Sequence, residues 1–149
     1  MHPINLAIAS NPKMFEARLI QGKVFKQIIE AIKDLVQDAN LECTEDSLDL
    51  QAMDSSHVSL VAVSLKANGF DHFRCDRSLN LGFNSANIAK IFKCAGSDDI
   101  VTLKAEDSGD TLTLMFESPS QDRIADFGTY FFKATTLIMH PSPSQTGTS

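Results

Sequence analysis

Several protein classes leave sequence patterns that this chain lacks. Its three cysteines, Cys43, Cys75 and Cys94, cannot all pair and have no C-x-x-C spacing, which indicates reduced thiols rather than a disulfide framework. No run reaches the roughly 18 apolar residues that a membrane-spanning helix needs. Residues 1–13 lack the basic start of a secretory signal, so we do not expect a secreted protein.

The sequence also lacks the motifs of common enzyme chemistry. Its four histidines show no metal-ligand spacing with cysteine or acidic residues, so no metal site is expected. No glycine-rich phosphate loop, G-x-S-x-G elbow or H-E-x-x-H motif occurs. A thiol–imidazole pair of Cys43 or Cys75 with His57 is the remaining catalytic alternative, but nothing in the sequence brings these residues together. The sequence therefore predicts a protein that is not an enzyme and binds no cofactor.

The composition is that of one ordinary globular domain. A chain of 149 residues with 43% hydrophobic and 21% charged residues can bury a core. Its net charge of -6 argues against general attraction to nucleic acid, because phosphate contacts need clustered lysine and arginine. An acidic chain can still carry a local basic face, so the positions of the lysines decide.

An antiparallel hairpin is expected at residues 48–65. Residues 48–52 alternate between apolar and polar, Asp54-Ser55-Ser56 supplies a polar turn, and residues 58–65 are mostly apolar. Further strands are expected at residues 14–20, 41–43, 70–76, 79–83, 100–105, 111–116 and 123–127. With two helices, and a weak internal repeat of helix–strand–strand groupings, this predicts an α+β domain whose helices pack on one face of an antiparallel sheet.

The two helices are expected at residues 24–36 and 86–94. At about 100° per residue, the apolar side chains of each helix share one face. Asn84 or Ser85 is expected to cap the second helix. Four lysines project from the opposite faces: Lys26, Lys33, Lys90 and Lys93.

These lysines allow two interpretations. Lysines opposite an apolar face are most often only a solvated surface. Because two helices repeat the pattern, packing them side by side gives a common basic strip, which suits sequence-independent contact with phosphates. No aromatic residues are interleaved with the lysines, so stacking on single-stranded bases is not indicated.

Four segments carry a resemblance to a known family: MFEARLIQG from Met14, QAMDSSHVSLV from Gln51, FRCDR from Phe73 and NIAKIFKCAG from Asn87. Over residues 14–127 the chain resembles the N-terminal domain of the proliferating cell nuclear antigen (PCNA) family, the eukaryotic DNA sliding clamps. Residues 1–13 precede the family's usual start, and residues 128–149 diverge, with a last part polar enough to be disordered. The family's connector and second domain are not seen, so the resemblance implies a truncated form of the clamp.

The resemblance implies a DNA-clamp domain with a specific role. In this family three subunits of two domains each close a ring around duplex DNA, hold polymerase there and catalyse nothing. The chain would thus be a polymerase processivity factor in the nucleus, serving DNA replication and repair. Gln27 departs from the family, in which a lysine is common. The residues that match the family's DNA-contacting positions are Arg18, Lys26, Lys33, Lys90, Lys93 and Arg123.

Two protein-binding surfaces also follow from the resemblance. The groove that binds aromatic-tipped peptides of polymerases and other partners matches Met53, His57, Val58 and Leu60. Taken without the resemblance, Val58 and Leu60 read as strand core and His57 as exposed surface. The edge that joins a neighbouring subunit matches Asp122, Arg123, Ile124, Ala125, Asp126 and Phe127.

Because the family's first-domain edge pairs with a neighbour's second domain, we do not expect this chain to close a homotrimer by itself. Two alternatives to active clamp function remain open. The chain is either an interaction protein that caps intact clamp subunits, or a non-functional truncated product.

Overall fold

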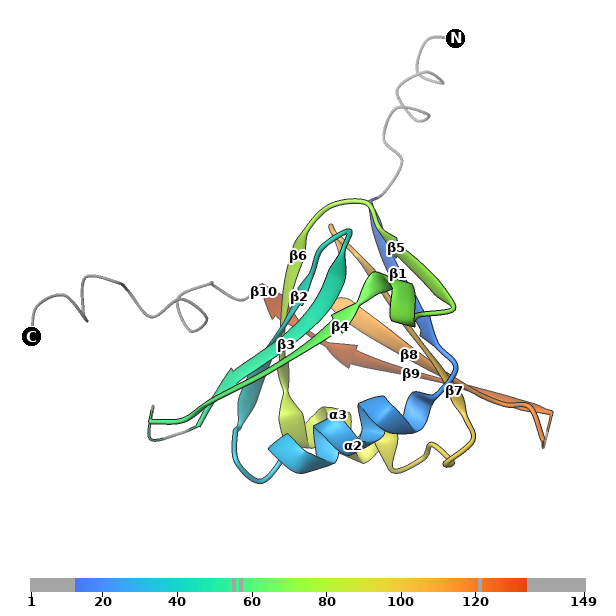
Figure 1. Ribbon diagram of the computed structural model, residues 1–149, viewed down its shortest axis with the longest axis horizontal. Helices are drawn as coiled ribbons and strands as arrows, with labels where there is room; N and C mark the ends of the chain where they lie inside the picture. The colour runs from blue at the N-terminus through green and yellow to red at the C-terminus, as the bar shows by residue number, and fades with distance from the viewer. Residues whose placement is uncertain (1–12, 55, 57, 121, 134–149) are drawn as a thin grey trace, which may run out of the picture.

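The computed structural model describes residues 13–54, 56, 58–120 and 122–133, and within them the chain runs twice through the same order of elements. Each half has a strand, an α-helix and four more strands (Figure 1). The first half comprises β1 (Met14–Leu19), α2 (Gly22–Ile32), β2 (Asp38–Cys43), β3 (Ser47–Met53), β4 (Leu60–Lys66), the 3-10 turn η1 (Ala67–Gly69) and β5 (His72–Cys75). The second comprises β6 (Leu79–Asn84), α3 (Ser85–Phe92), β7 (Ile100–Glu106), β8 (Thr111–Ser118), β9 (Arg123–Tyr130) and β10 (Phe132–Lys133).

The two halves interlock through their sheets. One antiparallel sheet has the order β5-β1-β7-β8-β9 and the other the order β10-β6-β2-β3-β4. The first strand of each half therefore pairs with the other half, β1 with β7 and β6 with β2. The last strand returns beside the first one, β5 on β1 and β10 on β6. The internal repeat expected from the sequence is thus present as a whole-domain repeat.

The α+β class is confirmed, but the number of sheets differs from the expected one. Both helices pack against antiparallel strands, but the strands form two sheets rather than the single sheet we expected. Figure 1 shows the two sheets approaching each other at one end of the domain, with α2 and α3 lying side by side across the opposite end. Apolar alternation marks each strand but carries no information on which strands pair, so it could not separate one sheet from two.

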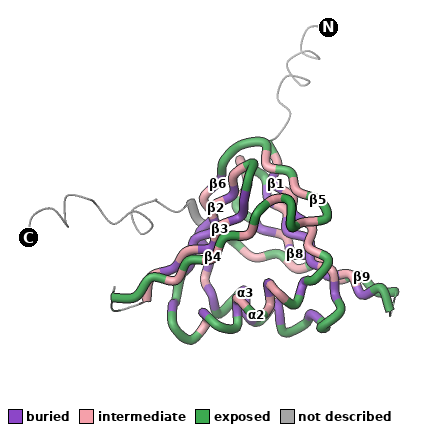
Figure 2. Tube along the Cα trace, in the orientation of Figure 1, coloured by how far each residue is buried: buried purple, intermediate pink, exposed green. Residues whose placement is uncertain are grey.

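The core lies between the two sheets and the helices. Phe25, Ile29 and Ile32 of α2 and Ile88 and Phe92 of α3 are buried there. In Figure 2 the exposed positions collect at the loops and along the outer parts of the β3–β4 and β8–β9 hairpins. None of the helices in the described ranges is long and apolar enough to cross a membrane.

Both helices differ from the expected boundaries by a few residues. The helix α2 begins at Gly22, where a Cβ atom would lie 2.4 Å from Val101 Cγ2, so only glycine fits this approach to β7. It ends at Ile32, and Val36 is buried beyond it in the following turn. The expected cap of α3 is Asn84, whose Oδ1 accepts a 3.0 Å hydrogen bond from the backbone N–H of Asn87.

Candidate nucleic-acid interface

The surface formed by α2 and α3 is held together by aromatic packing. The rings of Phe25 and Phe92 stack with centroids 5.8 Å apart and planes 8° apart. Phe92 also packs against Phe116 of β8, with centroids 5.4 Å apart. The two helices therefore pack side by side, which is the arrangement that a common basic strip requires.

Four predicted lysines lie on or beside these helices, but they are not equally free. Lys90 on α3 and Lys93 at its C-cap are exposed. Lys26 and Lys33 of the α2 side are half-buried. The Nζ atom of Lys26 donates a 2.9 Å hydrogen bond to the backbone carbonyl of Ala95, just after α3. The freest ammonium groups of the set therefore belong to α3.

A fifth lysine, Lys23, is exposed in the first turn of α2 and was not among the predicted residues. It lies before Val24, where the helix was expected to begin, so helical periodicity did not include it. Exposed acidic groups share this part of the surface, since Glu30 lies two turns along from Lys23 and Asp34 follows the helix. The basic strip is thus concentrated at α3 and mixed in sign along α2.

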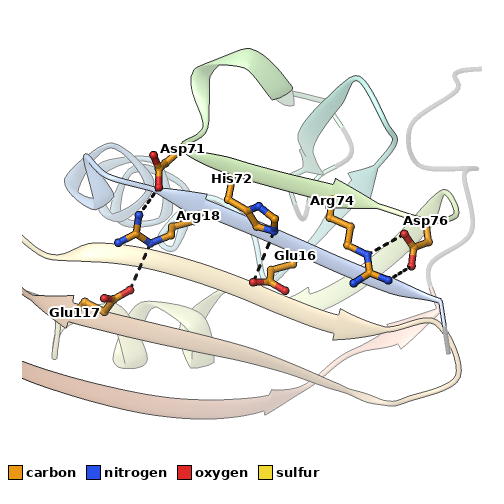
Figure 3. Close-up of polar contacts among 7 residues, drawn as sticks. All are labelled: Glu16, Arg18, Asp71, His72, Arg74, Asp76 and Glu117. Carbon is orange, nitrogen blue, oxygen red and sulfur yellow. Dashed lines mark hydrogen bonds and ion pairs between the residues drawn. The ribbon is translucent and has the colours of Figure 1, made fainter. Parts of the chain in front are cut away.

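Arg18 is placed away from the helix lysines. It lies on the opposite face of β1 from Phe15 and Ala17, which point into the core. Its guanidinium hydrogen-bonds Asp71 and reaches Glu117 at 3.5 Å, across the intervening strand β7 (Figure 3). The hydrogen bond to Asp71 is the largest effect and raises the pKa of Arg18. Burial, the next largest, lowers this pKa, and the charges of Glu117 and Asp71 add to the rise.

The remaining members of the same polar face follow β1 and β5. Figure 3 shows His72 above Glu16, with 3.8 Å between Nε2 and Oε2, and Arg74 beside Asp76. Two hydrogen bonds from Arg74, of 3.0 and 2.8 Å, and one from the backbone N–H of Met14 lower the pKa of Asp76 to about 2. The face is therefore charged but internally paired.

The predicted peptide groove lies on the β3–β4 hairpin. Met53 closes β3 opposite Leu60 of β4, and His57 lies outside the described residues. Val58 and Leu60 are 82% and 47% exposed, which excludes the alternative that they are strand core. The Asp54 carboxylate accepts a 2.9 Å hydrogen bond from the backbone N–H of Val58 and so holds the turn that presents them.

The predicted subunit edge is β9, the last strand of its sheet. Asp122 precedes the strand with a φ of 51°, in the left-handed region. Ala125 and Phe127 are half-buried on the inward side, while Arg123, Ile124 and Asp126 are exposed. Arg123 therefore lies on a sheet edge rather than on the helix surface. The strand continues past the predicted limit, to Tyr130.

In the described ranges, no cluster of three or more histidine, cysteine or acidic side chains can hold a metal ion. Cys43 is buried, and burial raises the pKa of its thiol well above the ordinary value. Burial also raises the pKa of Cys75, against the effect of a hydrogen bond to the Arg77 carbonyl. The suggested pairing of these thiols with His57 involves a residue outside the described part.

Comparison with protein families agrees with this geometry. The family model described as proliferating cell nuclear antigen, N-terminal domain, matches residues 14–136. The match starts at Met14, where the sequence resemblance starts, and continues beyond residue 127. Sliding clamps of this kind are non-enzymatic scaffolds that act in DNA replication together with DNA and clamp partners. The chain therefore belongs to the proliferating cell nuclear antigen family of sliding clamps, and the matched region is an N-terminal clamp domain.

Proposed function

We propose that this chain contacts duplex DNA through the surface of α2 and α3 and serves as part of a polymerase processivity factor in the nucleus, in DNA replication and repair. The observation that carries the proposal is the packing of two helices with Lys90 and Lys93 exposed on their outer side, in a domain of the sliding-clamp family. Contact with phosphates needs only positive charge on a rigid support, and it does not depend on base sequence.

The proposed DNA-contacting residues differ in how free their side-chain nitrogen atoms are to bind phosphate. Lys90, Lys93 and Lys33 have no hydrogen bond or ion pair from their ammonium groups within the described residues, so they are the main contacts. Lys26 keeps further N–H donors besides the one given to Ala95. Arg18 and Arg123 lie on strands and not on the helices. In this proposal they contact DNA or a partner only at the margin of the interface.

Partner binding is the second part of the proposal. Met53, Val58 and Leu60, with His57, would receive an apolar peptide motif from a polymerase or another clamp-binding protein. The exposure of Val58 and Leu60 supports this, because large apolar side chains exposed close together in the chain commonly mark an interaction site.

A second candidate function is that of an interaction protein that caps intact clamp subunits. The outer side of β9, which no strand of the described residues covers, favours it, since this edge could pair with an edge strand of an intact subunit.

One experiment separates these functions. The chain is mixed with intact clamp subunits and a clamp loader, and the retention of both proteins on nicked circular DNA and on linear DNA is measured. Retention of the chain on circles, with loss from free ends, supports the processivity function. Exclusion of the chain together with reduced retention of the intact clamp supports capping. Exclusion of the chain with no effect on the intact clamp overturns both.

A further inference from the structure

Two of the cysteines face the core from different sheets. Cys43 is the last residue of β2 and has no exposed surface. Cys75 is the last residue of β5 and lies directly opposite Phe15 of β1, whose buried side chain marks the inward face of that sheet. Both cysteines pack against the common hydrophobic core. Their thiols therefore point into the space between the two sheets, one from each side.

A short connection brings the ends of these two strands together. Only residues 76–78 separate Cys75 at the end of β5 from Leu79 at the start of β6. Leu79 in turn pairs directly with Cys43. Figure 1 shows this connection passing over the turn between β2 and β3, at the end where the two sheets approach each other. Packed sheets usually lie about 10 Å apart, and a disulfide needs Cα atoms within about 7 Å, so this end is the place where one can join the sheets.

The electrostatics of the thiols agree with this placement. Burial is the main cause that raises the pKa of Cys43, and the charge of Cys75 is the next. Burial also raises the pKa of Cys75 against the hydrogen bond to the Arg77 carbonyl, and the charges of Asp76 and then Glu45 add to the rise. Because the interaction of charges weakens with distance, Cys75 lies near both Cys43 and the turn that carries Glu45.

The thiols differ in their access to solvent. Cys75 is half-buried, and its Sγ atom donates a 3.1 Å hydrogen bond to the carbonyl of Arg77. Cys43 is fully buried, so a small oxidant reaches Cys75 first. The remaining cysteine, Cys94, is exposed just after α3, and the helices lie at the opposite end of the domain (Figure 1). It is therefore a free thiol outside this pair and serves as an internal control.

We propose that Cys43 and Cys75 form a reversible disulfide that joins the two sheets when the chain meets hydrogen peroxide. The Cys75 thiolate attacks one peroxide oxygen, the O–O bond breaks, and Cys75 becomes a sulfenic acid while the other oxygen leaves as water. The Cys43 thiolate then attacks the sulfenic sulfur, the S–O bond breaks, and the second oxygen also leaves as water. Two thiols are oxidised by two electrons in total, and one peroxide is reduced to two waters.

This oxidation requires neither DNA nor a partner, so it goes beyond the proposed function. Because only the thiolate reacts and burial disfavours it in both residues, disulfide formation should be slow at neutral pH and faster as the pH rises.

Peptide mapping of the full chain after treatment with hydrogen peroxide tests the proposal. Trypsin cuts after lysine and arginine, so Cys43, Cys75 and Cys94 fall in the separate peptides 34–66, 75–77 and 94–104. We expect peptide 34–66 joined to peptide 75–77 in the unreduced digest, and dithiothreitol should separate them. Adding dithiothreitol to the oxidised, intact chain should lower its thermal midpoint by about 5–10 °C, because the closed loop no longer restrains the unfolded state.

Single substitutions distinguish the roles of the two thiols. In Cys43→Ala the sulfenic acid on Cys75 has no neighbouring thiol, so dimedone, which labels sulfenic acids, should mark peptide 75–77 much more strongly than in the original chain. Cys75→Ser should give neither the label nor the linked peptide. Cys94→Ser is the control and should form the linked peptide like the original chain. Circular dichroism spectra verify that each variant is folded.

Several results would overturn this assignment. They are a peptide 34–66 that stays unlinked or is joined to peptide 94–104, a peptide 75–77 that gains only oxygen, or equal dimedone labelling of the original chain and Cys43→Ala. A thermal midpoint that dithiothreitol does not change would likewise contradict a disulfide between the sheets. The linked peptide is sought in the original chain, so this outcome does not depend on the folding of any variant.

Discussion

The Nζ atom of Lys26 on α2 lies 2.9 Å from the carbonyl oxygen of Ala95, in the loop that follows α3. This hydrogen bond joins α2 to the loop after α3. It lies beside the stacked rings of Phe25, which directly precedes Lys26, and Phe92, the last residue of α3. A lysine expected from its position to face DNA thus has a structural contact as well. The relative position of α2 and α3, and with it the spacing of the helix lysines, depends on these two contacts.

Replacing Lys26 with methionine keeps most of the apolar stem and removes the hydrogen bond to Ala95. We expect a loss of about 1–2 kcal/mol in the free energy of unfolding, because a part-buried carbonyl loses a charged donor. Urea unfolding followed by circular dichroism measures this loss. Lys33→Met is the control, and it should change stability by less than about 0.5 kcal/mol. Equal effects of both substitutions would contradict a specific role for the Lys26 contact.

Replacing Phe92 with alanine tests the packing of the helices on the sheets. Phe92 has no exposed surface and contacts Phe25 and Phe116, so the substitution should cost about 3–5 kcal/mol of folding stability. The neighbouring exposed residue supplies the control, since Lys93→Ala should change stability by no more than about 0.5 kcal/mol. Denaturant titration at low temperature gives both values. A cost below about 1 kcal/mol for Phe92→Ala would mean that α3 is packed differently.

The loss of folding stability at low pH should depend in part on the carboxylate of Asp76. Its pKa in the folded chain is lowered to about 2 from 3.8, chiefly by the hydrogen bonds from Arg74. A lowered folded-state pKa means that the carboxylate stabilises the fold at neutral pH. This contribution begins to fade near the unfolded value of 3.8 and is lost as the pH falls through about 2.

The corresponding comparison is between the original chain and Asp76→Asn. The variant should have a lower thermal midpoint at pH 6, and the difference between the two proteins should shrink as the pH falls below about 4. Asp98→Asn, at an exposed loop position, should show no such difference at any pH. A constant gap between the original chain and Asp76→Asn from pH 6 to about 2 would refute the assignment.

Much of the fold could be predicted from the sequence, because its signals are local. The alternation at residues 48–52, the turn after Met53 and the apolar faces of both helices give the hairpin and the helices directly. The division into two sheets could not be predicted, since it depends on β1 pairing with β7 and β2 pairing with β6. These pairs join strands far apart in the chain, and alternation is the same whichever strand lies alongside.

The candidate site was predictable in part for the same reason. Helical periodicity places Lys90 and Lys93 outward, as found, but it cannot show that Lys26 reaches a carbonyl on the next element. The position of Arg18 was available from the sequence, since it shares the alternation of Glu16 and opposes that of Phe15. The carboxylates that surround Arg18 come from β8 and the loop before β5, which only the tertiary structure brings together.

The most direct test of the account is the salt dependence of duplex DNA binding, measured by fluorescence anisotropy for the chain and its variants. We predict weak, sequence-independent binding, with Lys90→Glu and Lys93→Glu each lowering the slope of log affinity against log salt by about one. The control of matched charge, Lys104→Glu on β7, should bind like the original chain. A Lys104→Glu variant that loses as much affinity as Lys90→Glu, or lysine variants on α3 that bind unchanged, would contradict the helix surface as the DNA interface.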